Sequence, residues 1–516
     1  MELATSSMIS EIDEYLANEL GIPVTELMKR SGVAVANAIR KNVSAKKKVV
    51  FLVGKGNNGG DAYAAAANLV GEYELTVYDM FSAGQKSDAG RHFLNSYKEK
   101  GGKIVNYIPE ENILADIGGA DCIVDAVFGT GFKGEIPETL LTVSKAVNMS
   151  AAKKIAIDVP LGVNADNGSV NSGVIKVDIT VALSFIKPGL ISYPAKEFVG
   201  RIIYDDLMLY REKIVNSFHF KHYMLNGEWA EQNLPKRKSN SNKGTFGKAL
   251  LITGSEKYRG AAHLSLEAAL RGGAGLVTFF GDETLNAELR LKYPEAIYKI
   301  RPEISSFCED SIKNAVELSK SHTVTLIGSG SENTDGLLRL TLSLLSSDGG
   351  TLIIDADAIN ALASIGADGI SALRNAKRKV VLTPHPLEFS RLIGKDVSYV
   401  NSNRIELTEN FARENGVILL LKGAASIISD GDETYINPAE CTALAKAGSG
   451  DVLAGLIASL CAQMEVSTLK AVALAVYYHL IAAESLADKI SAYGVTPSDL
   501  PLEICRHIRK SEKGKK

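Results

Sequence analysis

The chain contains few cysteines and no long hydrophobic run. Its five cysteines are widely spaced without a Cys-x-x-Cys pair, which argues against a disulfide framework and a structural zinc site. The first twenty residues carry five acidic side chains, so they do not resemble a signal peptide. The longest uncharged stretches, such as Val452–Met464 and Ala471–Ala483, are shorter than the ~20 residues that cross a bilayer. We therefore expect a cytoplasmic protein with no membrane partner.

Neither sign of charge dominates the sequence. The 57 Lys and Arg residues against 60 Asp and Glu residues leave a net charge of -3, so no cationic field predicts a nucleic-acid partner. Hydrophobic residues make up 46% and charged residues 23%, as in ordinary globular proteins. At about 150 residues per domain, the 516 residues predict two or three domains.

Short β-branched runs alternate with helical segments in two successive series, which predicts an α/β fold class with mostly parallel sheets. The alternation of strand-like and helical segments is interrupted near residues 211–245, so we place the two domains at residues 1–215 and 216–510. The expected strands of the first series are Lys48–Val53, Glu74–Tyr78, Lys103–Tyr107, Cys122–Val127, Lys154–Ile157 and Ile179–Ser184. Those of the second are Lys248–Ile252, Leu276–Phe280, Val324–Ile327, Thr351–Ile354, Lys379–Leu382 and Val417–Leu421.

Other segments have their own signatures. A hairpin is expected to join Ser426–Ser429 to Thr434–Ile436, and two helical stretches, Gly450–Ala462 and Thr468–Lys489, follow it. By composition alone, residues 235–247 (PKRKSNSNKGTFG) favour a solvated linker. The basic tail RHIRKSEKGKK (residues 506–516) is expected to be disordered.

The first expected strand leads directly into a glycine-rich loop and an alanine-rich helix. The sequence GKGNNGGD (residues 54–61) satisfies the G-x-G-x-x-G pattern of dinucleotide-binding proteins, and Asp79 follows the next strand, where a ribose-binding acid would lie. A hydride-transferring NAD(P) dehydrogenase is therefore one interpretation, and a plain strand-to-helix turn is another. The asparagines and the aspartate of the loop favour a site, because amides at a helix N-terminus readily bind phosphate.

Further strands of the first series end in polar residues. Asp125 precedes a second glycine loop at residues 129–134, Asp158 follows Ile155–Ile157, and Lys187 follows Ile179–Ser184. One carboxylate after a strand is more often a helix cap than a catalyst. The carboxyl ends of parallel strands nevertheless meet at one crevice, where ligands bind. Together these residues predict a binding site at that edge.

Four motifs carry a resemblance to a known family: GNNGGD (56–61), DAVFGTG (125–131), IDVPLGVNADNG (157–168) and KPGL (187–190). They resemble the Rossmann-like epimerase domain of the NAD(P)H-hydrate repair enzymes, a three-layer α/β/α fold, over nearly all of the first 210 residues. The resemblance implies that the hydrated dinucleotide is bound by Asn57, Asn58, Gly59, Gly60, Asp61, Gly129, Thr130, Gly131, Phe132, Lys133, Gly134, Glu135 and Asp158.

The same resemblance implies a potassium ion held by Asn58, Asp125 and Leu161. The family usually has serine or threonine at the last position, and a leucine could offer only its backbone carbonyl. Epimerising a hydroxyl-bearing carbon beside a ring nitrogen requires proton transfer to and from an oxygen atom, which a positioned carboxylate can perform. We expect Asp158 to do this, with Lys187 as the weaker candidate.

The second series ends in AGSGDVLAG (residues 447–455), which opens an apolar helix. Small residues let helix amides approach a phosphate closely, and the helix dipole adds attraction. Asp451 beside that anion hole could deprotonate a hydroxyl group that attacks phosphorus. A simple helix cap is the alternative interpretation. The pattern resembles the ribokinase-like superfamily, which implies a ribokinase-like α/β fold for this domain.

Five more motifs narrow that resemblance to the ADP/ATP-dependent NAD(P)H-hydrate dehydratases: KGTFGKALLITGS (243–255), YRGAAHLSLEAALRGGAGLVT (258–278), DADAIN (355–360), TPHPLEFSRL (383–392) and LKGAASII (421–428). The resemblance implies that the hydrated nicotinamide lies near Ala262, Gly330, His385 and Asp451. It implies that the nucleotide is bound by Lys422, Gly423, Ala424, Ala425, Ser426 and Gly450. It also turns residues 243–247 from a linker into a mobile arm that contacts phosphate.

The resemblance implies the function as well. The chain would epimerise R and S hydrates of NADH and NADPH and dehydrate the S form at the expense of ADP, giving AMP and phosphate. Asp451 would assist attack of the 6-hydroxyl on the terminal phosphate, with Mg²⁺ neutralising the phosphates. The family also implies a homo-oligomer. Because the segment before the anion hole lacks the usual glycines, Lys446 is expected to substitute electrostatically.

Two other functions remain open from the sequence. A ribokinase-like small-molecule kinase fused to a Rossmann-like module would release a stable phosphorylated product. Alternatively, the N-terminal half is a non-catalytic binding module, in which case replacing Asp158 by Asn would leave epimerisation unchanged. A dehydrogenase is the weakest alternative, because no further acid/base pair of a substrate domain is apparent.

Overall fold

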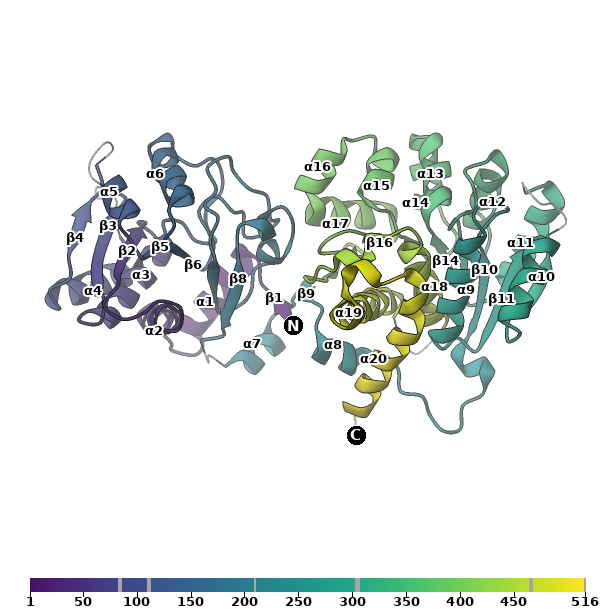
Figure 1. Cartoon of the computed structure of the whole chain (residues 1–516), viewed down its shortest axis with the longest axis horizontal. Coiled ribbons are helices and arrows are strands. Elements are labelled where there is room, and N and C mark those ends of the chain that lie inside the picture. Colours follow the sequence, from purple (N-terminus) through teal and green to yellow (C-terminus); the bar gives the residue numbers. More distant parts are fainter. Residues whose placement is uncertain (82–85, 109–112, 208–209, 302–306, 464–466, 515–516) are drawn as a thin grey trace. The chain divides into compact units, whose positions relative to one another are not determined.

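The computed structural model describes residues 1–81, 86–108, 113–207, 210–301, 307–463 and 467–514. The chain divides into two compact units, Glu2–His222 and Tyr223–Lys516, the latter together with Met1. Each unit is built around a mainly parallel sheet with helices on both faces (Figure 1). The predicted α/β fold class is confirmed.

The sheet of the N-terminal unit has the order β4-β3-β2-β5-β6-β7-β8, and every neighbouring pair is parallel. The six strands expected from the β-branched runs are all present, whereas β8 was not predicted. The strands are β2 (Lys48–Val53), β3 (Glu74–Asp79), β4 (Ile104–Asn106), β5 (Cys122–Ala126), β6 (Lys153–Ile157), β7 (Ile179–Leu183) and β8 (Arg201–Asp205); a short β1 (Glu2–Leu3) precedes them.

Helices cover both faces of this sheet, so the Rossmann-like three-layer architecture is confirmed. The neighbours α2, α3 and α4 pack together on one face, and α5 and α6 pack on the other (Figure 1). The helices are α1 (Ser6–Asn18), α2 (Val24–Asn42), α3 (Asn57–Leu69), α4 (Asp88–Glu99), α5 (Ile113–Gly118), α6 (Glu138–Met149) and α7 (Arg211–Ser217).

The sheet of the C-terminal unit contains the order β9-β18-β17-β16-β15-β14-β13-β10-β11-β12. Strands β10 to β16 pair in parallel, and β16, β17 and β18 are antiparallel, which confirms the predicted hairpin. The strands are β9 (His222–Met224), β10 (Lys248–Ile252), β11 (Leu276–Gly281), β12 (Ile297–Ile300), β13 (Val324–Ile327), β14 (Thr351–Ile354), β15 (Val380–Leu382), β16 (Ile418–Leu421), β17 (Ile427–Ser429) and β18 (Thr434–Ile436).

Two apolar cores lie on the two faces of this sheet. Helices α8, α9, α18, α19 and α20 share one core, and α11 to α17 share the other. The helices are α8 (Gly227–Asn233), α9 (Arg259–Arg271), α10 (Glu283–Lys292), α11 (Glu309–Lys320), α12 (Asp335–Leu345), α13 (Ala356–Ser364), α14 (Ala367–Arg374), α15 (Pro386–Ile393), α16 (Val397–Ser402), α17 (Arg404–Asn415), α18 (Ser449–Ala462), α19 (Thr468–Gly494) and α20 (Leu500–Gly514).

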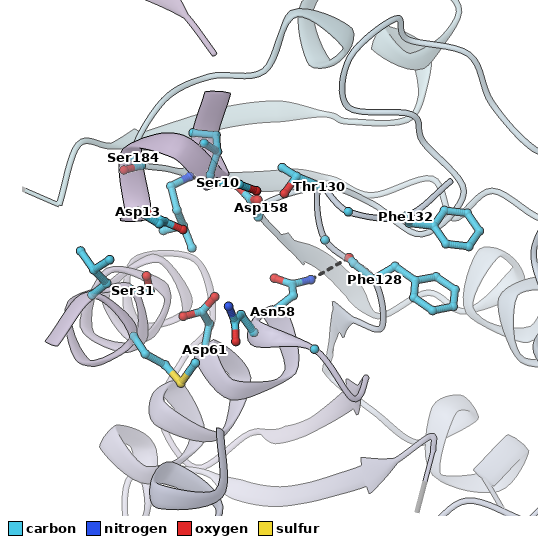
Figure 2. Close-up of a pocket in the computed structure, with 18 of the residues that line it drawn as sticks. Ser10, Asp13, Ser31, Asn58, Asp61, Phe128, Thr130, Phe132, Asp158 and Ser184 are labelled. Atoms are coloured by element: carbon cyan, nitrogen blue, oxygen red, sulfur yellow. Dashed lines mark hydrogen bonds between the residues drawn. The ribbon is translucent and has the colours of Figure 1, made fainter. Parts of the chain in front are cut away.

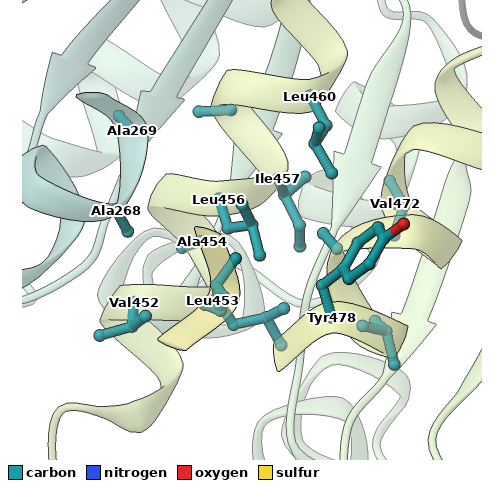
Figure 3. Close-up of a cluster of buried hydrophobic side chains, with 14 of the residues drawn as sticks. Ala268, Ala269, Val452, Leu453, Ala454, Leu456, Ile457, Leu460, Val472 and Tyr478 are labelled. Carbon is teal, nitrogen blue, oxygen red and sulfur yellow. The ribbon is translucent and has the colours of Figure 1, made fainter. Parts of the chain in front are cut away.

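The apolar helix α18 lies between α9 and α19 (Figure 3). Among the described residues, α19 is the one helix long and apolar enough to cross a membrane, but 72% of its most apolar window is buried in the fold. It is therefore a core helix, because its apolar side chains already contact protein. Burial on several sides explains why both helices are apolar around most of their circumference.

The prediction of a disordered basic tail was wrong for the described residues. Helix α20 continues through the basic run to Gly514. Its apolar residues Leu500 and Ile504 are buried in the core, and the buried Glu503 carboxylate accepts hydrogen bonds from Lys489 at 2.6 Å and Arg506 at 2.7 Å. Arg506 of the basic tail thus pairs with a buried carboxylate, so the tail is not simply solvated.

Candidate active sites

The glycine loop after β2 is shaped by close backbone contacts. A Cβ atom on Gly54 would lie 1.8 Å from the carbonyl oxygen of Val127, and one on Gly59 would lie 2.1 Å from the carbonyl oxygen of Gly54. Both positions therefore require glycine. The loop closes onto the segment after β5, and α3 begins at Asn57 with its N-terminal amides beside the second glycine loop.

A cavity of about 550 Å³ opens at this edge of the sheet. Its walls come from α1, α2, α3 and the loops after β2, β5, β6 and β7 (Figure 2). The predicted residues that line it are Asn57, Asn58, Asp61, Gly129, Thr130, Gly131, Phe132, Lys133, Asp158 and Lys187. Gly59 and Gly60 are buried inside α3, and Asn171 Nδ2 contacts Gly134 O and Glu135 Oε2 at 3.1 and 3.2 Å, away from the lining.

Asp158 and Lys187 form an ion pair at the ends of β6 and β7. Lys187 is only 1% exposed, and its Nζ donates to the Asp158 carboxylate and, at 2.9 Å, to the carbonyl oxygen of Leu183. Asp158 has φ +65°, a left-handed conformation that is uncommon for a residue with a Cβ. Such conformations cluster at functional sites, where the surrounding fold holds them in place.

Two more carboxyl groups line the cavity, and burial favours their neutral forms. Burial raises the pKa of Asp61 well above its ordinary value, the negative charge of Asp158 reinforces the shift, and a hydrogen bond from Ser31 opposes it. Burial also raises the pKa of Asp13 to about 6, against the attraction of Lys187. Asp13 was missed from the sequence, although its helical spacing with Ser6 and Ser10 makes a polar stripe on α1.

The residues expected to hold potassium have oxygen atoms of the required kind. Asn58 Oδ1 is buried without a hydrogen-bond partner, while its Nδ2 donates to the carbonyl oxygen of Phe128 at 2.7 Å (Figure 2). The buried Asp125 carboxylate accepts two backbone N–H bonds, yet burial still raises its pKa to about 6. The Leu161 side chain lies in the apolar core, so only its backbone carbonyl is available.

In the C-terminal unit, the start of α18 is pressed against α9. A Cβ atom on Gly455 would lie 2.1 Å from the carbonyl oxygen of Ser265, so glycine permits the close crossing of these helices. Asp451 lies in the first turn of α18, about one turn before this crossing. Burial raises the pKa of Asp451 to about 7, helped by the charge of Asp355 and opposed by Lys422. A carboxylate with a pKa near 7 suits a general base.

A polar network around Lys422 joins the ends of four strands, β13, β14, β15 and β16. Its Nζ donates to Asp355 Oδ1 at 3.0 Å, and the same carboxylate accepts bonds from Thr383 at 2.7 Å and Ser329 at 2.8 Å. Burial alone would lower the pKa of Lys422, but Asp355, Glu388 and Asp451 hold it above its usual value. Asp355, Thr383 and Ser329 were not assigned from the sequence, although each follows a strand at the sheet edge where ligands bind.

A cavity of about 380 Å³ collects most of the expected nucleotide-binding residues, namely Lys422, Gly423, Ala424, Ser426 and Gly450; Ala425 is fully buried. Apolar side chains such as Leu453, Val476 and Leu480 complete its walls. His479 also lines it and was missed. Its Nε2 is buried without a hydrogen-bond partner, and burial lowers its pKa to about 4. Apolar side chains make up much of the cavity wall.

The residues expected near the hydrated nicotinamide surround the start of α9 and of α15. Ala262 is buried in α9, and a Cβ atom on Gly330 would lie 2.6 Å from that of Ala261. His385 caps α15, because its Nδ1 accepts bonds from the N–H groups of Leu387 and Glu388. Burial lowers the pKa of His385, with the nearby Lys422 charge adding to the effect. Its predicted contact with substrate stays a prediction.

Two expectations concern cations that would contact phosphate. The Lys446 Nζ donates to the carbonyl oxygens of Tyr493, at 2.7 Å, and Val495 at the end of α19, and its expected electrostatic role stays a prediction. The segment Lys243–Phe246 forms a capped 3-10 turn, with Arg237 stacked over Phe246 at 3.7 Å. It is thus a folded element, and its role as a phosphate-contacting arm stays a prediction.

Both halves of the chain match families of known proteins. Residues 249–506 match the family described as "NAD(P)H-hydrate dehydratase", and residues 24–189 match "YjeF-related protein N-terminus". The chain is 32% identical to the "Bifunctional NAD(P)H-hydrate repair enzyme Nnr" of Moorella thermoacetica, covering 97% of this chain and 95% of that one. The Escherichia coli enzyme of the same name is 29% identical, covering 94% and 89%.

Among solved structures, the C-terminal unit is similar to the ADP/ATP-dependent NAD(P)H-hydrate dehydratase from Bacillus subtilis, co-crystallised with ATP/Mg²⁺. The identity is 30%, the TM-score is 0.50, and the match covers 56% of this chain and 99% of that one. The C-terminal unit thus shares the α/β fold of this dehydratase. From end to end, the chain belongs to the family of bifunctional NAD(P)H-hydrate repair enzymes.

Proposed function

We propose that the protein repairs hydrated NADH and NADPH. Residues 1–215 interconvert the R and S hydrates, and residues 216–510 dehydrate the S form to NAD(P)H at the expense of ADP, giving AMP and phosphate. The observation that supports this most is the presence of both halves of the family in one chain, each with a carboxylate and a buried lysine at the strand ends.

The dehydratase chemistry follows from the start of α18. Asp451, with its pKa near 7, takes the proton of the 6-hydroxyl while that oxygen attacks the terminal phosphate of the nucleotide. Phosphate then leaves C6 as the lone pair of N1 forms a C6=N1 double bond, and loss of a proton from C5 forms the C5=C6 double bond and returns the electron pair to N1, which restores the reduced nicotinamide. Lys422 faces the nucleotide cavity and can attract the phosphates, and the N-terminal amides of α18 add a positive field.

Magnesium, when bound, neutralises the phosphates during transfer. The described residues contain no group of three or more His, Cys, Asp and Glu side chains arranged to hold a metal ion. The phosphates of the nucleotide would therefore supply most of the ligands, as is usual for Mg²⁺. Lys422, Gly423, Ala424, Ala425, Ser426 and Gly450 bind the nucleotide, and Ala262, Gly330, His385 and Asp451 contact the hydrated ring.

In the epimerase half, Asp158 moves the proton at the C6 oxygen and Lys187 holds that carboxylate in place. The dinucleotide lies along Asn57, Asn58, Gly59, Gly60, Asp61, Asp158 and the loop 129–135. The buried, unpartnered Asn58 Oδ1 and the Asp125 carboxylate are the kind of oxygen ligands that suit K⁺, with the Leu161 carbonyl as the third. Bound there, K⁺ would supply the positive charge that the Asp125 carboxylate lacks.

The proposal includes a cytoplasmic location, a homo-oligomeric state and no nucleic-acid or membrane partner. The near balance of charges and the burial of α19 within the core support the last two points. The 30% identity to an ADP/ATP-dependent enzyme supports either nucleotide as co-substrate, and ADP is our choice.

The first test is the near-ultraviolet absorbance of reduced nicotinamide. Purified protein receives mixed R and S hydrates of NADH, magnesium, and ADP or ATP in turn. We expect full recovery of NADH with ADP, beyond the S fraction and faster than spontaneous epimerisation. Asp158→Asn should stop recovery at the S fraction, and Asp451→Asn should abolish it.

Two outcomes would contradict the proposal. Recovery by the unmodified protein that stops at the S fraction would remove the epimerase half of it. No recovery with either nucleotide would remove the repair function, and a small-molecule kinase with a stable phosphorylated product would then explain the anion hole.

A further inference from the structure

Helix α1 is fastened to the wall of the N-terminal cavity at its first residue. The Ser6 hydroxyl donates to Asp166 Oδ1 and to the carbonyl oxygen of Thr130, both at 2.8 Å, and the Ser6 N–H donates to the same carboxylate at 2.6 Å. Ile12 and Leu16 are buried on a neighbouring face of the helix. These contacts fix the rotation of α1, so that Ser10 and Asp13 face the cavity (Figure 2).

Asp13 therefore lines the same cavity as the charged residues of the site. Its carboxyl group interacts electrostatically with Lys187 and Asp158, and also with Asp61 on α3. Lys55 and Lys133 line the same cavity at exposed positions. Three carboxyl groups thus line the cavity near one buried ammonium group. Because burial disfavours the charged form, it raises the pKa of Asp61 and of Asp13, and at about 6 the Asp13 carboxyl group can exchange a proton near neutral pH.

Figure 2 places Asp13 and Asp158 on different elements around the same opening. Asp158 comes from the end of β6, and Asp13 comes from the helix that precedes the sheet. Their positions give the site two separate carboxyl groups, which is what an exchange between two faces of a ring requires. One group must give a proton while the other takes one.

We propose that Asp13 is the second proton-transferring carboxyl group of the epimerase site and works as the partner of Asp158. This inference rests on the proposed epimerase function. One of the two carboxyl groups is protonated and the other is ionised, and Lys187 stabilises the ionised one. The roles exchange when the reaction runs in the opposite direction.

The step balances without any further reagent. The acid gives its proton to the C6 hydroxyl, the C6–O bond breaks, and water leaves as the lone pair of N1 forms a C6=N1 double bond. Water then attacks C6 from the opposite face, a new C6–O bond forms, and the electron pair returns to N1. The base takes the proton of the attacking water, so the protons and electrons are conserved.

The test compares Asp13→Asn with Glu14→Gln, a matched loss of charge at the next, exposed position of α1. Epimerisation of isolated R hydrate is followed by chromatography without nucleotide, so that dehydration does not contribute. We expect Asp13→Asn to slow epimerisation by about 100-fold or more, the usual contribution of a general acid or base, and Glu14→Gln to leave it unchanged. Dehydration of S hydrate with ADP should remain normal in both.

A pH profile separates proton transfer from a structural role. The unmodified protein should show a change in epimerisation rate near pH 6, where Asp13 titrates, and Asp13→Asn should lose that change. Asp13→Glu keeps the carboxyl group, so it should retain the pH change and part of the rate. It also carries the test if the Asn variant does not fold.

An Asp13→Asn protein that epimerises as fast as Glu14→Gln, or that keeps the change near pH 6, would overturn the inference. So would an Asp13→Glu protein that folds but has lost the pH change. If the unmodified protein itself does not epimerise the R hydrate, the proposed function fails instead, and the two failures are thus distinguished.

Discussion

At the scale of single residues, both sites combine carboxyl groups of raised pKa with a buried lysine. Burial raises the pKa of Asp451 to about 7 beside Lys422, and burial raises that of Asp13 to about 6 beside Lys187. Each lysine donates a hydrogen bond to one neighbouring carboxylate, Asp355 in one unit and Asp158 in the other. The remaining carboxyl groups are left close to the pH at which they can exchange protons.

The first prediction at this scale concerns Asp451. Because a general base acts in its ionised form, the rate of S-hydrate dehydration should rise about tenfold per pH unit up to about pH 7 and then level off. Asp451→Asn should lower the rate by at least about 100-fold at every pH. Asp368→Asn, a change at an exposed position of α14, should behave like the unmodified protein.

Nucleotide phosphates also titrate near neutral pH, so nucleotide binding should be measured by calorimetry on both sides of pH 7. A dehydration rate that does not change across this range at saturating nucleotide would show that Asp451 is not the base.

At the scale of elements, most polar groups of the two sites lie at the carboxyl ends of strands. Contacts between helices determine how closely their backbones approach each other. Gly455 lets the backbone of α18 contact that of α9, and Asp451 lies about one turn earlier in α18. Ser6 plays the corresponding part for α1 by binding both Asp166 and Thr130. Helix α20 closes the core of the C-terminal unit through the buried Glu503.

The prediction for α20 is a pH-dependent loss of stability in Glu503→Gln. Although burial alone would raise the pKa of Glu503, hydrogen bonds from Lys489, Arg506 and Ser485 lower it to about 2. A carboxyl group with a lowered pKa stabilises the fold above its unfolded pKa, and that contribution is lost as the pH falls toward 2. We expect the variant to lose about 2 kcal/mol of unfolding free energy at pH 7.

Urea unfolding followed by tryptophan fluorescence can measure this, because Trp229 is the one tryptophan of the chain and is buried in the core that α20 joins. The difference from the unmodified protein should shrink between about pH 4 and pH 2. Glu512→Gln, at an exposed position of the same helix, is the control. An equal effect of both variants would contradict the role of Glu503.

At the scale of the whole molecule, the chain consists of two units, each with its own cavity. We expect the activities to be separable. Full-length Asp158→Asn should keep dehydration of S hydrate, and full-length Asp451→Asn should keep epimerisation. When the two variants are mixed with R hydrate and ADP, NADH should form again, because the S hydrate can diffuse from one protein to the other.

Absorbance of NADH measures this mixing experiment, with each variant alone at the same total concentration as control. Recovery in the mixture no faster than spontaneous epimerisation would contradict diffusion of the intermediate between the two sites.

Much of the fold could be predicted because its signals are local. Continuous β-branched runs mark buried parallel strands, and glycine loops mark the turns that follow them. Of the strands that were missed (β1, β8, β9 and β12), β8 and β12 lie at sheet edges and are only partly buried, so their sequences lack that apolar signal. The rule that strand ends converge was enough to gather Asp125, Asp158 and Lys187 into one site.

By itself, then, the sequence determined the two α/β units, their glycine loops and the carboxylates Asp158 and Asp451, because these depend on local pattern and on strand order. The tertiary structure decided that Asp13 lines the same cavity as Lys187, that Asp355 binds Lys422 and that Lys446 binds the end of α19. Partners and burial arise from residues far apart in the chain, and burial is what sets the proton affinity of each carboxyl group.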